Sequence, residues 1–194
     1  MNERIMKMKA TCVTMLTCAC VALIISGCGA GNDTSTGFGW LVGGCAGQDQ
    51  ALVEQQAGFD ESCKADNLLP EEPDYCTEKL FWHYDAATGT LQMVNAYVSL
   101  NCCGIRYVRG EFTEGFHTFI EMDEPDGYRC RCMCDTIYSM CLHDLAPDLT
   151  PIRLLRHVTD ETLQPETIWE GELDLNDGSG VIELGPSSSW HCEG

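Results

Sequence analysis

The sequence predicts an all-β protein in which two layers of mainly antiparallel strands pack face to face. Two observations support this prediction. From Leu80 onward, short runs rich in β-branched and aromatic residues alternate with turn sequences. The chain also carries 14 cysteines in 194 residues, and half of them lie in this same part. We therefore expect a β-sandwich reinforced by disulfide bonds.

The expected strands follow one another at short, roughly regular intervals. They are residues 80–85, 90–101, 105–112, 117–122, 151–158, 167–175 and 181–184. The turn containing Gly89 predicts a hairpin between the first two strands. The sequence NDGSG (176–180) predicts a hairpin between the last two, because Asn, Asp and Gly tolerate positive φ. Many short strands with turns between them are typical of an immunoglobulin-like sandwich.

Residues 90–101 alternate between two faces. Val94, Ala96, Val98 and Leu100 form the more continuously apolar face, and we expect this even-numbered face to point into the core. The odd-numbered face carries Asn95, Tyr97 and Ser99 and is expected to point away from it.

The N-terminus has the order of an export signal. Arg4, Lys7 and Lys9 precede an uncharged run of sixteen residues, 10–25. That run is short for a membrane span, which needs about 20 apolar residues. Met1 and Met6 are both consistent with the translation start.

The four residues Ile25-Ser26-Gly27-Cys28 follow directly and resemble the lipobox of bacterial lipoproteins. The resemblance implies cleavage before Cys28, a diacylglycerol thioether on its sulfur and an acylated amine. The alternatives are an ordinary signal peptide cut near Gly27 or Ala30, and an uncleaved helix. Gly29 takes the place after the cysteine, which resembles the outer-membrane class of these lipoproteins.

We therefore expect three parts: a signal peptide (1–27), a flexible Gly/Ser/Thr-rich tether (28–47) and one disulfide-rich β domain (48–194). The expected location is the bacterial cell envelope, with the chain attached to the membrane through lipid on Cys28.

Cysteine parity agrees with the lipobox. Three cysteines lie within the signal, and lipid on Cys28 leaves ten, an even number that can close five disulfides in an oxidising compartment. The disulfide candidates are Cys45, Cys63, Cys76, Cys102, Cys103, Cys130, Cys132, Cys134, Cys141 and Cys192. Sequence alone leaves their connectivity open.

Four cysteines gather in RCRCMCDTIYSMC (129–141). On an extended strand, Cys130 and Cys134 would lie about 13 Å apart, whereas sulfurs around one zinc ion lie within about 4 Å of each other. On a strand these cysteines would therefore bridge to different neighbours, with the adjacent Cys102 and Cys103 as the facing pair. The alternative is a copper or zinc site at Cys130, Cys132, Cys134 and Cys141, which requires the segment to coil into a loop.

Other chemistry is weakly indicated. The formal net charge of −19 and the absence of a basic stripe argue against nucleic acid as a partner. We expect no enzymatic activity and no cofactor, since the chain lacks the G-x-S-x-G, H-E-x-x-H and phosphate-loop motifs. The acidic run EMDEPD (121–126) is expected to be a solvated loop, with Ca²⁺ binding as the alternative. The five histidines are expected to be surface or core residues.

The blocks NCCG (101–104) and RCRCMCD (129–135) are similar to those of uncharacterised cysteine-rich bacterial lipoproteins that carry N-C-C and C-x-C-x-C blocks. This resemblance spans residues 101–135. It implies a small β-sandwich with the two blocks close together, and it assigns no activity. We therefore expect a disulfide-locked display or binding domain that contacts a protein or glycan, with an envelope metal-binding lipoprotein as the alternative.

Overall fold

A computed structural model of the chain describes residues 37–43, 58, 60, 63, 65–72 and 74–187. All of these belong to the unit Thr36–Gly194. Their strands are β1 (Phe38–Gly43), β2 (Thr77–Asp85), β3 (Thr90–Asn101), β4 (Ile105–Thr113), β5 (Phe116–Glu124), β6 (Met133–Leu142), β7 (Leu149–Val158), β8 (Glu166–Asp174) and β9 (Ser179–Pro186). Short 3-10 turns lie at Asp66–Leu68 (η2) and Leu175–Asp177 (η3).

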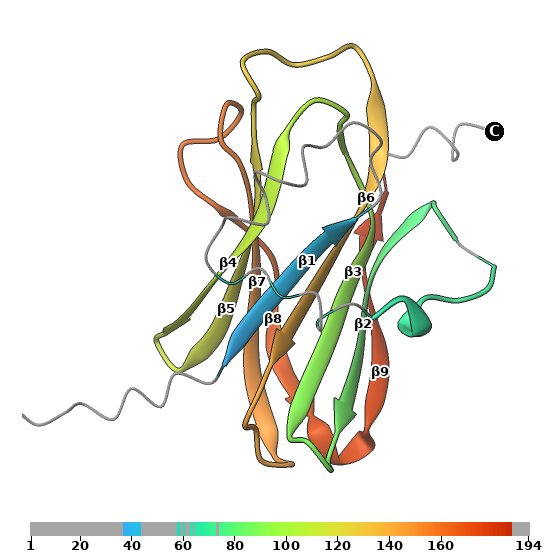
Figure 1. Cartoon of the computed structure of the whole chain (residues 1–194), viewed down its shortest axis with the longest axis vertical. Coiled ribbons are helices and arrows are strands. Elements are labelled where there is room, and N and C mark those ends of the chain that lie inside the picture. The colour runs from blue at the N-terminus through green and yellow to red at the C-terminus, as the bar shows by residue number, and fades with distance from the viewer. Residues whose placement is uncertain are drawn as a thin grey trace, which may run out of the picture. The chain divides into compact units, whose positions relative to one another are not determined.

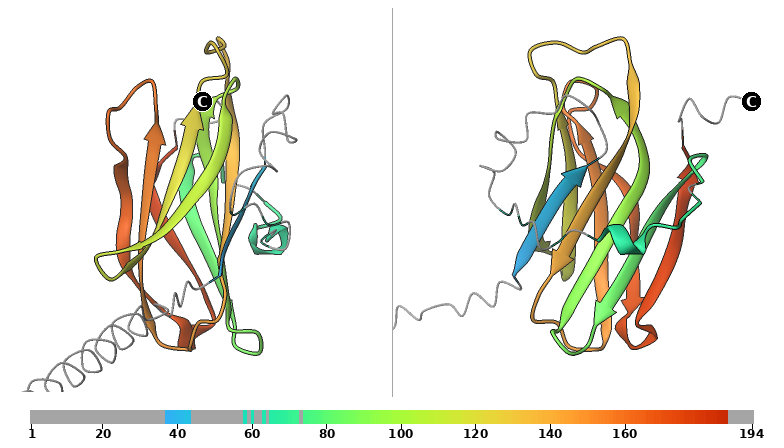
Figure 2. Two further views of the ribbon diagram at one scale, coloured as in Figure 1. Left: turned by 60° about the vertical axis from the view of Figure 1, so that its left-hand side comes forward. Right: turned by 45° about the vertical axis from the view of Figure 1, so that its right-hand side comes forward.

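The strands form two sheets that pack face to face, which confirms the predicted β-sandwich (Figure 1). The five-stranded sheet has the order β1-β6-β3-β2-β9, and the four-stranded sheet has the order β4-β5-β7-β8. Figure 2 shows the two layers from other sides. Pairing is antiparallel except between β5 and β7, which run parallel.

The main core lies between the sheets and contains large aromatic and aliphatic side chains. Its members include Trp40, Leu80, Trp82, Leu91, Met93, Val108, Phe119, Tyr138, Met140, Ile152 and Leu154. A second, smaller core lies on the other face of the five-stranded sheet. There Ala65, with the half-buried Leu68, Leu69 and Tyr75, covers Phe81, Val94, Ala96 and Tyr97.

The expectation for the faces of residues 90–101 is wrong for half of the strand. Leu91 and Met93 point into the main core, and Val94 and Ala96 belong to the second core. The pairing of β3 with β6 shifts between Asn95 and Val98, and Tyr97 takes φ +66°. This bulge exchanges the two faces, so that Val98 and Leu100 lie in the main core.

Two further expectations need correction. Part of the expected tether, Phe38–Gly43, is strand β1 of the five-stranded sheet, where Trp40 is fully buried. The expected last hairpin does not form, because β8 pairs with β7 in one sheet and β9 pairs with β2 in the other. The NDGSG sequence instead carries the chain across the sandwich, with Gly178 at φ +75°.

Candidate functional site

Two disulfides join the cysteine blocks at one end of the sandwich. Cys102 bonds to Cys132 and Cys103 bonds to Cys130, with Cα–Cα distances of 5.5 and 5.4 Å. We call residues 101–104 and 130–132, with these two bonds, the clasp. It confirms that the blocks are close together and that the adjacent cysteines have different partners. The clasp ties the β3–β4 turn to the loop that leads into β6.

The two residues that flank the cysteine pair, Asn101 and Gly104, each have a structural role. The Asn101 side chain accepts hydrogen bonds from the backbone N–H groups of Cys103 (3.1 Å) and Cys130 (3.0 Å), and its amide donates to the Cys130 carbonyl (2.7 Å). At Gly104, a Cβ atom would lie 2.1 Å from Oδ1 of Asp123. Asparagine thus holds the two blocks in register, and glycine leaves room for the carboxylate beneath.

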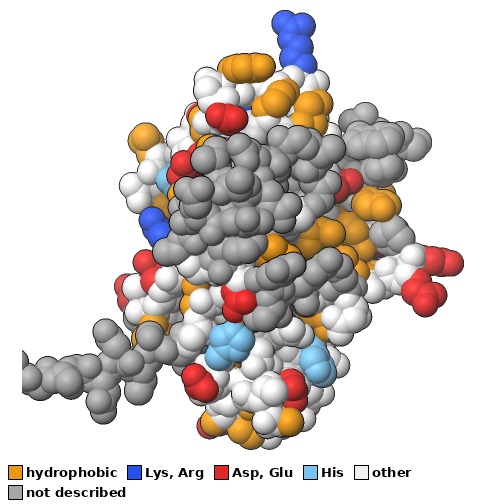
Figure 3. Space-filling view, viewed as in Figure 1, with side chains coloured by type: hydrophobic (Ala, Val, Ile, Leu, Met, Phe, Trp, Pro, Cys, Tyr) orange, Lys and Arg blue, Asp and Glu red, His pale blue; other side chains and the backbone are white. Residues whose placement is uncertain are grey.

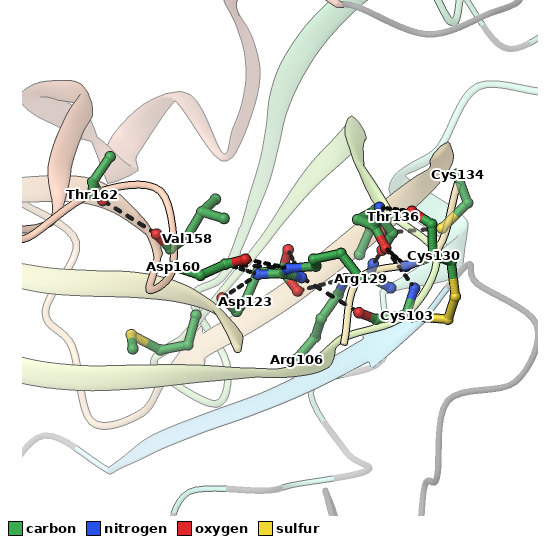
Figure 4. A network of polar contacts seen from close by, with 12 residues as sticks. Cys103, Arg106, Asp123, Arg129, Cys130, Cys134, Thr136, Val158, Asp160 and Thr162 are labelled. Carbon is green, nitrogen blue, oxygen red and sulfur yellow. Dashed lines mark hydrogen bonds and ion pairs between the residues drawn. A yellow bond between two sulfur atoms is a disulfide. The ribbon is translucent and has the colours of Figure 1, made fainter. Parts of the chain in front are cut away.

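A chain of ion pairs runs from the clasp to the β7–β8 turn (Figure 4). Asp123 is buried at the end of β5 and lies 2.9 Å from Arg129 Nη1 and 3.6 Å from Nε of the buried Arg106. Arg129 also forms an ion pair with Asp160. Burial raises the pKa of Asp123, and the hydrogen bond from Arg129 opposes that shift. The two disulfides join two of the loops at this end, and the ion pair of Arg129 with Asp160 attaches the third.

A second buried network links the two sheets. Arg156 of β7 donates to Glu121 of β5 (2.7 and 2.9 Å) and to Glu78 of β2 (2.6 and 3.1 Å). Asn95 of β3 donates to both carboxylates. Glu121 is fully buried, and its burial raises its pKa to about 7; Arg156 opposes this shift and Glu78 adds to it.

These networks correct the interpretation of EMDEPD. Glu121 and Asp123 lie on a strand and are buried among arginines, so they belong neither to a solvated loop nor to an open calcium loop. Glu124 accepts a hydrogen bond from the Tyr107 hydroxyl, and only Asp126 is exposed.

A different group of residues has the composition of a metal site. Asp60, Cys63, Cys141 and His143 each offer one ligand atom, and these four atoms lie within 4.8 Å of one another. We call these four residues the sulfur–imidazole cluster. Cys63 and Cys141 are fully buried and joined by a disulfide, whereas the side chains of Asp60 and His143 are 37 % and 34 % exposed.

Strand β1 positions the cluster. Its outer edge pairs with the segment before Cys63, through Trp40 N–H to the Gly58 carbonyl and Asp60 N–H to the Trp40 carbonyl (both 2.8 Å). Gly39 lies opposite Cys141 in β6, and a Cβ atom there would be 2.5 Å from the Cys63 sulfur. A glycine at this register position is what allows the segment to lie over the strand.

Eight of the ten cysteines that the sequence predicts to form disulfides lie in the described residues. All eight described cysteines are disulfide-bonded, Cys76 and Cys134 included. Cys28, Cys45 and Cys192 lie outside the described residues, as do the signal peptide and most of the expected tether. The alternative metal set is not brought together, because Cys130, Cys132 and Cys141 bond to three different cysteines.

Sequence reasoning placed Cys63 and Cys141 among disulfide candidates but missed Asp60 and His143 as their neighbours. The alternation Cys141-Leu142-His143 at the end of β6 was the available signal, since residues two apart share one face of a strand. Nothing in the sequence around Asp60 indicated that it approaches this strand.

Surface charge is consistent with the composition. On the face drawn in Figure 3, acidic side chains are spread over the described part, and Lys and Arg lie at isolated points. Large exposed apolar side chains include Tyr128 and Met133, which flank the clasp. Among the described residues, no helix is long and apolar enough to cross a membrane.

The comparisons with known proteins give no match. No protein-family model fits the chain, and neither the curated proteins nor the solved structures contain a significant relative.

Proposed function

We propose that this chain is a lipid-anchored protein of the bacterial cell envelope, whose disulfide-locked β-sandwich presents a surface to a protein or glycan partner. One observation carries the proposal: every cysteine of the described residues is closed in a disulfide. Stable disulfides form in oxidising, extracytoplasmic compartments and are rare where thiols are kept reduced. The closed cysteines therefore support export of the chain to such a compartment.

The N-terminal sequence supports the anchor. Residues 25–28 resemble a lipobox, and lipid on Cys28 uses the one cysteine that an even set of disulfides leaves over. A chain with a net charge of −19 is repelled by anionic membrane surfaces, so attachment through a covalent lipid suits it.

The clasp supports the presenting role. Two disulfides and the Arg129–Asp160 ion pair hold three loops at one end of the sandwich. Tyr128 is 76 % exposed in the loop before the clasp cysteines, and Met133, which follows them in sequence, is 48 % exposed. Aromatic side chains on a rigid frame lose little conformational entropy on binding, which favours them as contact residues.

The anchor is tested by expressing the full chain in bacteria fed a labelled fatty acid. The wild-type chain should incorporate label and enter the detergent phase, and Cys28→Ser should do neither. Cys20→Ser, which removes a cysteine from the apolar run, is the matched control and should be labelled like wild type. Label retained by Cys28→Ser, or absent from wild type, contradicts the anchor.

The disulfide-locked state is tested by intact mass after alkylation, with and without prior reduction. We expect no alkylated cysteine before reduction and ten additional alkylations in the processed chain after it. Three or more cysteines alkylated without reduction contradict the locked state.

A further inference from the structure

From the sulfur–imidazole cluster, we propose that reduction of the Cys63–Cys141 disulfide creates a zinc site whose four ligands are Asp60, Cys63, Cys141 and His143. The proposal goes beyond the disulfide-locked presenting role, and it stands on side-chain geometry alone. It holds whether or not the chain carries a lipid.

The ligand set matches the chemistry of zinc. Zinc is bound in proteins by thiolate sulfur, imidazole nitrogen and carboxylate oxygen, most often four at a time in a tetrahedron. The cluster contains two sulfurs, one imidazole and one carboxylate, and its ligand atoms already lie within 4.8 Å of one another. The carboxylate oxygen favours zinc over Cu(I), which selects softer ligands.

The imidazole is oriented for this role. Nε2 of His143 lies 3.4 Å from the Cys141 sulfur and 3.7 Å from Oδ2 of Asp60. Its other nitrogen, Nδ1, lies 3.3 Å from the Thr90 hydroxyl. Histidine ligands in metal sites are held in the same way, with the second ring nitrogen engaged by a neighbouring oxygen.

The backbone around the cluster is fixed independently of the disulfide. Asp60 N–H bonds to the Trp40 carbonyl, Cys63 N–H bonds to the Asp60 carbonyl (3.1 Å), and His143 N–H bonds to the Gly37 carbonyl (2.8 Å). Breaking the sulfur–sulfur bond therefore leaves four ligand residues attached to β1 and β6. Among the described residues, this is the one disulfide with an imidazole and a carboxylate grouped around its sulfurs.

The disulfide acts as the gate. A dithiol reductant transfers two electrons and two protons to the Cys63–Cys141 bond and is itself oxidised to a disulfide. The sulfur–sulfur bond breaks and two thiols form. Zn²⁺ then displaces the two thiol protons and binds both thiolates. In the oxidised chain the two sulfurs are bonded to each other and carry no thiolate charge, so the metal lacks its two strongest ligands.

The test follows zinc at this site by alkylation footprinting of the full chain in detergent. The chain is reduced with a phosphine, freed of reductant without air, and treated with an alkylating reagent with and without one equivalent of Zn²⁺. Peptide mass mapping then gives the alkylation rate of each cysteine. We expect zinc to slow the alkylation of Cys63 and Cys141 at least about tenfold, and a chelator to restore it.

Two variants make the test specific. His143→Ala removes a partly exposed ligand that forms no disulfide, and we expect it to abolish the protection and weaken zinc binding at least about tenfold in competition with a chromogenic chelator. His83→Ala, which removes a histidine of β2 outside the cluster, should behave like wild type. Circular dichroism of both variants establishes that they are folded.

Three results would overturn the proposal. The first is zinc that leaves the alkylation of Cys63 and Cys141 unchanged. The second is equal zinc affinity in His143→Ala and His83→Ala. The third is an oxidised chain that binds zinc as tightly as the reduced chain with the same dependence on His143, because the thiolates would then be unnecessary.

Discussion

The buried network between the sheets makes the stability of the protein depend on pH. One guanidinium, that of Arg156, faces two carboxylates, those of Glu121 and Glu78, so the fully ionised network carries an excess negative charge in a buried place. Protonation of Glu121 removes this excess and leaves the Arg156–Glu78 pair intact. The burial of Glu121 correspondingly raises its pKa to about 7, from an ordinary value of 4.5.

The sign and size of the effect follow from proton linkage. Between pH 4.5 and 7 the folded protein keeps a proton on Glu121 that the unfolded chain has released, so the free energy of unfolding falls as the pH rises. The stabilisation is complete below pH 4.5 and is lost as the pH passes 7. The rise of the pKa from 4.5 to about 7, at about 1.36 kcal/mol per pH unit, corresponds to about 3 kcal/mol.

The assay is chemical denaturation of the oxidised protein at a series of pH values from 4 to about 8, the range that brackets these pKa values. Glu121→Gln should lose about 3 kcal/mol of the wild-type decline in the free energy of unfolding. The exposed Glu172→Gln is the matched control and should keep it. If Glu121→Gln and wild type show the same slope between pH 4.5 and 7, the reasoning about the buried network is refuted.

Three further perturbations test the described core and clasp. Trp40→Ala removes a fully buried ring from β1 and should cost about 3–5 kcal/mol of unfolding free energy; a loss below about 1 kcal/mol would mean that β1 is not part of the core. Gly104→Ala places a methyl group 2.1 Å from a buried carboxylate oxygen and should cost about 1–3 kcal/mol, whereas Gly43→Ala meets no atom within 4 Å and should change stability by less than about 0.5 kcal/mol. The quadruple variant Cys102→Ser/Cys103→Ser/Cys130→Ser/Cys132→Ser removes both bonds of the clasp and opens a loop with a sequence separation of 30. It should lower the free energy of unfolding by about 3.5 kcal/mol, measured by denaturant titration, and an unchanged midpoint would contradict the role of the clasp.

The sequence predicts the bounds of a strand best where alternating apolar residues and flanking turn residues mark it locally. Residues 90–101 were predicted as one strand and form β3 with the same bounds. Alternation identified the strand but not its orientation, because the five-stranded sheet is buried on both faces. The bulge at Tyr97 then reversed the faces midway, and a tyrosine gives no sequence signal of positive φ.

Strand β1 and the crossing from β8 to β9 were missed for a different reason. Phe38–Gly43 lies in a Gly/Ser/Thr-rich stretch whose composition is typical of a tether, and its pairing partner, β6, is about a hundred residues away. The turn before β9 has the residues of a hairpin, but the sheet that accepts the next strand is decided by β2, far back in the chain. Pairing between strands so far apart in the chain produces no pattern in the residues of either strand that sequence analysis could recognise.

The candidate site was predictable only in part. The two cysteine blocks were expected to meet, and the geometric argument that in-line cysteines bond to different neighbours is confirmed at Cys130 and Cys132. The sulfur–imidazole cluster was not predicted, since it depends on a segment near Asp60 lying against the edge of β1. Buried acidic residues were equally hidden, because Glu121 and Asp123 become interior residues only once arginines from other strands reach them.

The position of β9 has a consequence for how the chain acquires its structure. β9 is the last strand of the described residues, yet it pairs with β2, the strand that begins the long run of sheet residues. During synthesis from the N-terminus, the hydrogen-bonding edge of β2 stays open until residues 179–186 have emerged. Open edges join readily to other chains, and non-local pairing is slow. Residues 179–186 thus cover the edge of β2 last and leave the short β9 as the edge strand in its place, and truncations that remove β9 should yield aggregates rather than a smaller folded domain.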